Sequence, residues 1–328
     1  MKGVFIVSLD YELFWGMQDV IALDRYKDNV LGTYTVIPKL LDLFERFEIH
    51  STWATVGMMH ANGVEDLRGY IPAVLPTYKR TIVNTYGCLD AIEDKDGLWD
   101  RYFFASDMID KIQKHAGVEI GSHTFSHYYC DESGQTKDQF INDIVSDKRI
   151  RGCVQIRSFV FPRNQSIKEY IDVIEREGIS VYRGVEDNWI HRIKSKLLMR
   201  TLRLVDTYIP ITGTNEYIPE SNSCMNLHGS RMFKPYNPKL KIFEKLKMHR
   251  IKNQMLNAAK NNKVFHLWFH PHNIGINQDI NLEQLEFIFE YYKYLKEVFG
   301  FESMNMREAE DYFRREGLNH DDNKRNNR

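Results

Sequence analysis

Two histidines set four positions apart form the clearest chemical pair in this sequence. They end the segment Glu119-Ile-Gly-Ser-His-Thr-Phe-Ser-His127, which follows a strand-like apolar run. On one helical turn, His123 and His127 would face the same way and bind one divalent ion, such as zinc. The spacing alone is more often found in surface or core residues, but a parallel barrel places its functional loops at strand ends.

Two carboxylates end the first strand-like run, in Ser8-Leu9-Asp10-Tyr11-Glu12. Residues two apart in an extended chain point to the same side, so Asp10 and Glu12 are expected to enter one site together. Paired carboxylates suit a division of labour in which one holds a metal and the other moves protons. The competing interpretation is a pair of solvated acids that follow a strand.

Three histidines alternate at the end of the last clear strand, in Val264-Phe-His-Leu-Trp-Phe-His-Pro-His272. His266, His270 and His272 can share one face for as long as the strand continues, and Pro271 fixes the relative direction of its two neighbours. At least one of the three can instead be a core residue that only forms hydrogen bonds.

An arginine stands at a fourth strand end, in Phe159-Val-Phe-Pro-Arg-Asn-Gln165. Arg163 can hold a carboxylate in a fixed fork geometry, although a lone arginine is structural more often than not. Together the four strand ends supply a metal site, a base, an acid and an orienting cation. That set describes metal-assisted hydrolysis of a carbonyl or similar bond.

The elements that must position these residues alternate between short apolar runs and helical patterns, which predicts a β/α architecture. Stretches at about 60–105 and 207–240 contain several prolines or glycines and are expected to be long insertions that shape a cleft. A single domain is expected over 1–315, ending in a helix from about 306, and the polar residues 316–328 are expected to be a disordered tail. The strand-like runs cover residues 4–9, 49–56, 118–120, 158–161, 179–182 and 264–269.

The bulk composition excludes several classes of protein. With 44 basic against 45 acidic side chains, the chain as a whole gives no support for a nucleic-acid or anionic-membrane surface, which leaves only local patches. The four cysteines form no CxxC pair and are expected to be reduced thiols. We expect no signal peptide and no membrane span, because no apolar run approaches ~20 residues, and therefore a cytoplasmic location.

In order and spacing, these motifs resemble the polysaccharide deacetylase family, the NodB-like carbohydrate esterases of family 4. His123-Thr-Phe-Ser-His127 is a full match to the family's His-Ser/Thr-x-x-His motif, while Phe161-Pro-Arg163, Trp189 and the end of Phe265-His-Leu-Trp-Phe-His270 resemble other motifs. The resemblance implies a distorted (β/α) barrel of seven to eight strands, a single domain with long loop insertions, and a bound divalent metal, zinc or a related ion.

The resemblance also implies a ligand set. His123 and His127 would bind the metal, with Glu12 in the third position. The family usually has two adjacent aspartates where this chain has Asp10-Tyr11-Glu12. Glutamate is one methylene longer, and the intervening tyrosine restores a same-side arrangement; the alternative is a two-histidine site with water in the third place.

The acid and base follow from the same resemblance. Asp10 would be the general base that takes a proton from the attacking water, and Arg163 would orient it. His270 would be the general acid that protonates the leaving amine, with His272 as the second choice.

The implied reaction is removal of an N-acyl group, such as acetyl, from an amino sugar. We expect a nucleotide-linked or lipid-linked precursor in surface-glycan synthesis, with Trp15, Trp189 and Trp268 against the substrate. Aromatic residues of the first insertion can stack on sugar faces or form the core of that insertion. The alternatives are hydrolysis of another carbon–nitrogen bond, in a formamide or a cyclic amide, and an inactive glycan-binding barrel, which the Asp10-Tyr11-Glu12 departure keeps open.

Overall fold

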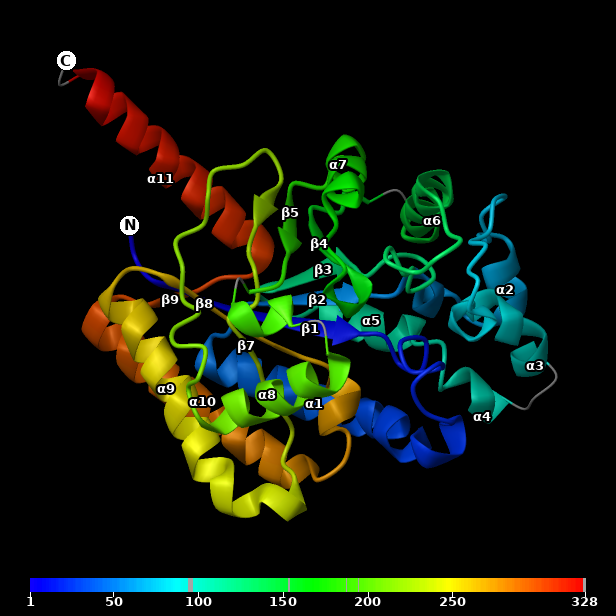
Figure 1. The fold of residues 1–328 in the computed structure, drawn as a ribbon, viewed down its shortest axis with the longest axis horizontal. Helices are drawn as coiled ribbons and strands as arrows, with labels where there is room; N and C mark the ends of the chain where they lie inside the picture. Colours follow the sequence, from blue (N-terminus) through cyan, green and yellow to red (C-terminus); the bar gives the residue numbers. More distant parts are fainter. Residues whose placement is uncertain (94–96, 153, 187, 194, 327–328) are drawn as a thin grey trace.

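A parallel β-sheet lies at the centre of the molecule in the computed structural model, which describes residues 1–93, 97–152, 154–186, 188–193 and 195–326 (Figure 1). All ladders between its strands run parallel, so a connection between two paired strands must cross over the sheet, as the alternation of strands and helices predicts. The strands are β1 (Val4–Tyr11), β2 (Ser51–Thr55), β3 (Val118–Ser122), β4 (Ser158–Val160), β5 (Val181–Arg183), β6 (Met225–Asn226), β7 (Arg231–Met232), β8 (Val264–Phe269) and β9 (Glu302–Ser303).

One broken strand closes the sheet into a barrel. The strand order is β6-β5-β4-β3-β2-β1-β8-β7, with β9 on β1 off this path, so β6 and β7 are its two edges. Only residues 227–230 separate them, and this segment bonds to both neighbouring strands: the amide of Leu227 donates to the carbonyl of Tyr182, and the amide of Ser230 donates to the carbonyl of His266. The described strands therefore occupy seven positions, with β6 and β7 sharing one. The predicted distorted (β/α) barrel is confirmed.

Helices cover the outside of the barrel. Alternate residues of β1, namely Phe5, Val7 and Leu9, pack in the main hydrophobic cluster with apolar side chains of these helices. The principal ones are α1 (Lys27–Phe47), α5 (Ser106–Gln113), α6 (Lys137–Ile150), α7 (Lys168–Arg176), α8 (Lys196–Tyr208), α9 (Glu244–Lys260) and α10 (Gln278–Phe299).

The inward side of β1 changes from apolar at the amino end to polar at the carboxyl end. Val4 and Ile6 of β1 share a buried cluster with Met306 and Phe313 of α11 (Met306–Asn326), which plugs the amino end. The next inward residues of β1 are Ser8 and Asp10, so this strand becomes polar toward its carboxyl end.

The last helix is longer than expected. We predicted its end near residue 315 and disorder beyond, because 316–328 has almost no apolar side chains. In the structure α11 continues to Asn326, since no proline interrupts its backbone hydrogen bonds and polar side chains do not prevent a helix. Residues 327–328 lie outside the described part of the chain. No described helix combines the length and the apolar character that crossing a membrane requires.

The two expected insertions differ from each other. The first is folded into short helices, namely α2 (Val64–Arg68), α3 (Leu89–Glu93), α4 (Gly97–Asp100) and the 3-10 turns η2 (Gly57–His60), η3 (Thr81–Val83) and η4 (Thr85–Cys88). The second, expected at 207–240, contains β6 and β7 and so belongs to the barrel itself. Strands of two residues are too short to leave a recognisable apolar pattern.

Candidate functional site

The first strand delivers both carboxylates to the carboxyl end of the barrel. Asp10 and Glu12 are buried and lie on the same side of the extended chain, as their spacing predicts. Leu13 follows with a positive φ of 47°, which turns the chain away from the strand. Gly16 then passes so close to Glu12 that a Cβ atom there would lie 2.3 Å from its carboxylate. The absence of a side chain at Gly16 therefore allows the position of the carboxylate.

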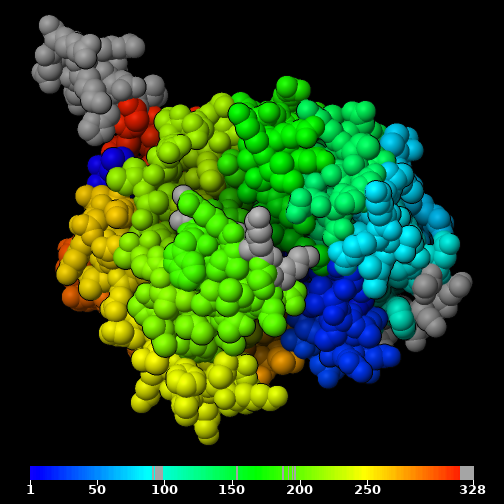
Figure 2. Space-filling model, viewed as in Figure 1, coloured from blue at the N-terminus to red at the C-terminus, as the bar shows by residue number. Residues whose placement is uncertain are grey.

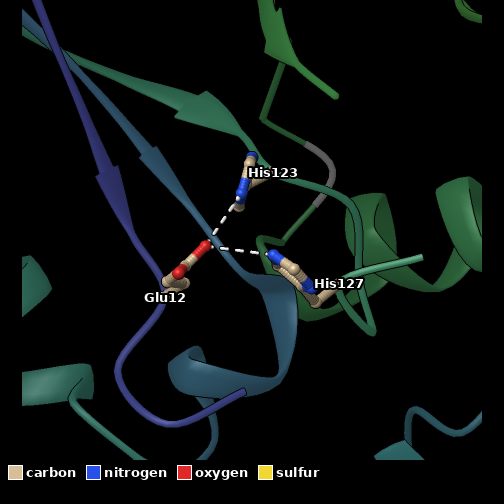
Figure 3. A group of neighbouring side chains, drawn as sticks. All are labelled: Glu12, His123 and His127. Atoms are coloured by element: carbon tan, nitrogen blue, oxygen red, sulfur yellow. Dashed lines mark hydrogen bonds and ion pairs between the residues drawn. The ribbon is translucent and has the colours of Figure 1, made fainter. Parts of the chain in front are cut away.

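Glu12 brings the two histidines together (Figure 3). Its Oε2 atom lies 3.2 Å from Nε2 of His123 and 3.0 Å from Nε2 of His127. One ligand atom from each residue lies within 4.8 Å of the others, and all three side chains are buried. Burial disfavours the charge of Glu12, but the nearby His270 and His127 rings outweigh it and hold its pKa well below the usual value.

The protonation of His123 shows what the group is suited to bind. Its Nδ1 lies 2.8 Å from the carbonyl oxygen of Val160, which can only accept, so Nδ1 carries the proton. Nε2 faces the Glu12 carboxylate, where it can either donate a second proton or, as a neutral ring, offer its lone pair to a cation bound between them. Two imidazole nitrogens and a carboxylate are a donor set typical of zinc, with the carbonyl bond orienting the ring. These residues therefore fit a divalent metal.

The two histidines lie on a loop, which corrects the expected helical turn. His123 follows the end of β3, and positive φ values at Thr124 (64°) and His127 (55°) bend the backbone. Asp143 of α6 accepts hydrogen bonds from the amides of Phe125 and Ser126, at 2.8 and 3.1 Å, and also from the Ser126 hydroxyl. Burial raises the pKa of Asp143 to about 7. Asp143 thus holds the loop in the shape that turns both rings toward Glu12.

Arg183 at the end of β5 holds Asp10. Its two terminal nitrogens each lie 2.7 Å from one oxygen of the carboxylate, and the guanidinium lies 4.3 Å from the ring centre of Trp268. Burial of Asp10 favours its neutral form, but the Arg183 charge, with His270 and His123, outweighs this and lowers its pKa. Asp10 is therefore a buried, charged carboxylate of fixed direction.

The expected role of Arg163 is corrected. Arg163 bonds to Asp19 and stacks at 4.5 Å over the ring of Tyr129, so it does not orient Asp10. The reason is local: its φ of 54° turns the chain after β4 and directs the side chain toward the rim. Arg163, Asp19 and Tyr129 form a wall beside His127, whose ring meets the Tyr129 ring edge-on at 5.0 Å.

The three late histidines separate into three environments. His266 is a core residue, with Nδ1 2.9 Å from the Leu227 carbonyl and Nε2 2.7 Å from Ser8 Oγ. His272 is also buried, and burial lowers its pKa to about 3, so its ring is neutral. His270 is partly exposed, and its Nε2 lies 3.6 Å from Asp10 and 3.7 Å from Glu12.

The three tryptophans expected at the substrate also differ. Trp15 is fully buried, with its indole N–H 2.7 Å from the Phe103 carbonyl, so it packs below the site and cannot touch a substrate. Trp268 is buried under Arg183 and forms part of the wall next to His270, with the ring centres 5.8 Å apart. Trp189 is 48% exposed and lies six residues beyond the end of β5.

Arg183 is the functional residue that the sequence reasoning missed. It ends the short apolar run at 179–182, so the rule that singled out Arg163, a charged residue at a strand end, applies to it equally. Asp19 and Tyr129 left no such signal, because they lie in irregular loops.

Comparisons with solved structures identify the fold. No protein-family model and no curated protein matches this sequence. A protein described as a polysaccharide deacetylase from Mycobacterium smegmatis matches with a TM-score of 0.58 and 12% identity, over 96% of this chain and 92% of that one. A probable polysaccharide deacetylase from Pseudomonas aeruginosa PAO1 and Puue allantoinase each match with a TM-score of 0.51 and 12% identity, over 95% of this chain and 89% of theirs.

Proposed function

We propose that this chain, which has the fold of the polysaccharide deacetylases, is a metal-dependent hydrolase that removes an N-acyl group from an amino sugar. The observation that carries the proposal is the buried Glu12, His123 and His127 group, which lies beside a fixed Asp10 and a partly exposed His270. Burying so many ionisable groups together costs desolvation free energy, and a structural or purely binding barrel would not require it.

A divalent ion held by Glu12, His123 and His127 would supply Lewis acidity to the acyl carbonyl and to the attacking water. Asp10, kept charged by Arg183, takes the proton from the water at Oδ2, the oxygen that faces His270. His270 returns a proton to the leaving amine nitrogen from Nε2. His272 is unsuited to that role, because a ring with a pKa of about 3 carries no proton to donate.

The finer points of the proposal concern substrate and compartment. The Trp189 side chain is exposed close to the end of β5, where it is available to a sugar face. We keep the nucleotide-linked or lipid-linked acylated amino sugar as substrate class and zinc as the metal. The cytoplasm stays the proposed compartment, supported by Cys88, Cys130 and Cys224, which are free thiols.

The test is release of acetate from a panel of acetylated amino sugars, free and nucleotide-linked, by protein loaded with zinc. Turnover that disappears in Asp10→Asn while the metal content is unchanged supports the proposal. A zinc-loaded protein that leaves every sugar intact but hydrolyses another amide would overturn the substrate class. A protein that binds no metal under these conditions would overturn the mechanism.

A second candidate is hydrolysis of a cyclic amide. Puue allantoinase matches the fold with the same TM-score as the Pseudomonas deacetylase, so the fold alone does not choose between their substrates. Allantoin belongs in the same panel, and its hydrolysis without acetate release from any sugar would favour this candidate.

A further inference from the structure

The outer face of α8 is apolar where a surface helix is usually polar. Leu197, Leu198, Leu204 and Val205 are all exposed, and Leu197 has 77% of its surface open. Their positions, at i, i+1, i+7 and i+8, form one stripe along the helix. The inward face instead carries the buried Asp206 and Thr207. This stripe therefore has no partner within the described chain.

A second apolar segment lies beside the first. The 3-10 segment η7 (Pro238–Phe243) exposes Ile242, at 74%, and Phe243, and Leu246 is exposed just beyond it. The ring of Phe243 lies 5.8 Å from that of Tyr208, the last residue of α8. Figure 1 shows α8 at the front of the view, and Figure 2 shows the yellow-green segment as a raised surface there. We call α8 and residues 238–246 the α8 face.

The exposed charge on this face has one sign. Residues 196–208 hold three Lys or Arg and one acid, and residues 238–246 also hold three and one, in a chain whose net charge is −1. Both acids are turned inward: Asp206 bonds to Arg231 and Arg250 at 3.0 and 2.9 Å, and Glu244 is buried against Lys247.

The cations, in contrast, point outward. Arg200, Lys239, Lys241 and Lys245 are exposed. The face ends at the groove between α9 and α10, where Glu283, Glu286 and Glu290 contribute to the lining. The α8 face is thus an apolar stripe whose own exposed charges, among the described residues, are positive, and acidic side chains follow beyond it on one side.

The topology places this face near the catalytic end of the barrel. The chain leaves β5 at Arg183, which holds Asp10, and reaches α8 through Trp189. The η7 segment follows β7 in the same way, so both segments begin at carboxyl ends of strands.

We propose that the α8 face docks the protein on an anionic lipid bilayer. Exposed aliphatic side chains on a helix rimmed by Lys and Arg are the composition of an interfacial helix, with the apolar groups entering the acyl boundary and the cations meeting anionic headgroups. A protein partner would match this face only if its own surface were both acidic and apolar. The proposal stands on the composition of the surface and is independent of the reaction.

Sedimentation of the full chain with vesicles tests the proposal. We expect binding to vesicles of equal phosphatidylcholine and phosphatidylglycerol, and none to phosphatidylcholine alone. Binding should fall by about tenfold or more when salt is raised to roughly 0.5 M, because screening weakens the headgroup attraction. Trp189 is exposed and precedes α8 in the chain, so its fluorescence reports on this side of the molecule. Vesicle binding should shift the tryptophan emission to the blue, and Trp189→Phe should remove that shift.

Paired variants separate the two components. The double change Leu197→Ser with Ile242→Ser, and the double change Arg200→Glu with Lys241→Glu, should each reduce partitioning by about tenfold or more. All four side chains are exposed, so thermal melting should stay unchanged. The matched control is Val298→Ser with Lys114→Glu, which removes an exposed aliphatic group and reverses an exposed charge elsewhere.

Three results would overturn the proposal. One is equal sedimentation with both kinds of vesicle, and another is equal loss of binding in the control. The third is a dimer in sedimentation equilibrium that Leu197→Ser dissociates, which would assign the face to a second copy of the chain.

Discussion

Buried carboxylates lie at both ends of the barrel, and their partners are different. At the carboxyl end, Asp10 and Glu12 face Arg183 and histidine rings, which outweigh burial and lower both pKa values. At the amino end, burial raises the pKa of Glu119. Its oxygens accept hydrogen bonds only from neutral donors: the Ser158 hydroxyl at 2.6 Å, the Thr52 hydroxyl at 2.9 Å and the Arg307 amide at 3.1 Å.

The neighbours of a buried acid decide whether it stays charged. Hydroxyls and amides satisfy the oxygens of Glu119 and connect β2, β3 and β4 to the start of α11. These hydrogen bonds favour the charged form, but burial, which favours the neutral form, outweighs them and raises the pKa. A charged acid needs a buried cation, which costs desolvation energy that the fold must offset. Among the described residues, Asp10 bonds to such a cation and Glu119 to neutral donors alone, and that contrast can be tested.

The largest effect is expected from His123→Ala. Removing one of two imidazole ligands should abolish metal binding and, with it, several kcal/mol of transition-state stabilisation, or about 10⁴-fold in kcat/KM. Metal analysis of the purified variant and acetate release measure both effects. Full metal content in this variant would mean that His123 is not a metal ligand.

The change Asp10→Asn should remove the general base and leave the metal site intact. We expect kcat to fall by about 10³-fold, because the amide cannot accept the proton, while the metal content stays at the wild-type level. Arg183 is left facing a neutral partner, so thermal melting should be followed alongside. Unchanged turnover would show that Asp10 is not the base.

A smaller effect is expected from Gly16→Ala. The added Cβ would overlap the Glu12 carboxylate, which is the far end of a flexible side chain, so the carboxylate should move and the fold should persist. Metal affinity should fall by about 10–100-fold without a change in melting temperature. Gly87→Ala is a suitable control, because a Cβ there meets nothing within 4 Å.

Glu119→Gln tests the other end of the barrel. Since burial already shifts Glu119 toward its neutral form, the amide should cost only about 1 kcal/mol of unfolding free energy and leave kcat unchanged. Denaturant unfolding measures the first and the deacetylation assay the second. Loss of activity without loss of stability would break the proposed contrast between the two ends.

The smallest effect concerns His50, which bonds at 2.7 Å to Glu308 of α11. This bond raises the pKa of His50 above 6.5, so its stabilisation is fully present below pH 6.5 and is lost as pH rises through the higher folded-state pKa. Both groups are more than a third exposed, so solvent screening limits the effect to about 0.5 kcal/mol. The difference in unfolding free energy between wild type and His50→Gln, measured across this pH window, should vanish on the alkaline side.

The sequence allowed prediction of the fold because its longest strands carry strong apolar runs. β1, β2 and β8 lie within the runs predicted at 4–9, 49–56 and 264–269 or extend them by at most two residues. β6 and β7 escaped prediction because each is two residues long and is defined by hydrogen bonds to distant strands, which no local pattern records.

The candidate site was also predictable only in part: the residues on strands were, and those on loops were not. The spacing of Asp10 and Glu12 correctly predicted that they share a side, because strand geometry fixes it. The rotation of a loop is not fixed by spacing: positive φ values at Thr124 and Arg163 decided that the histidines lie outside a helix and that Arg163 bonds to Asp19. Trp15 was placed in the core by contacts from Phe103, 88 positions away.

The single segment that forms β6 and β7 also has a kinetic consequence. Its two halves bond to β5 and to β8, so the ring of strands cannot close until residues up to Phe269 have been synthesised. β1 likewise waits for β8, about 260 positions later in the chain, before its second edge is covered. Such distant pairings carry a high loop-closure entropy and predict slow folding. During synthesis, the polar end of β1 therefore stays open on one side, and the site forms only as the last step of closure.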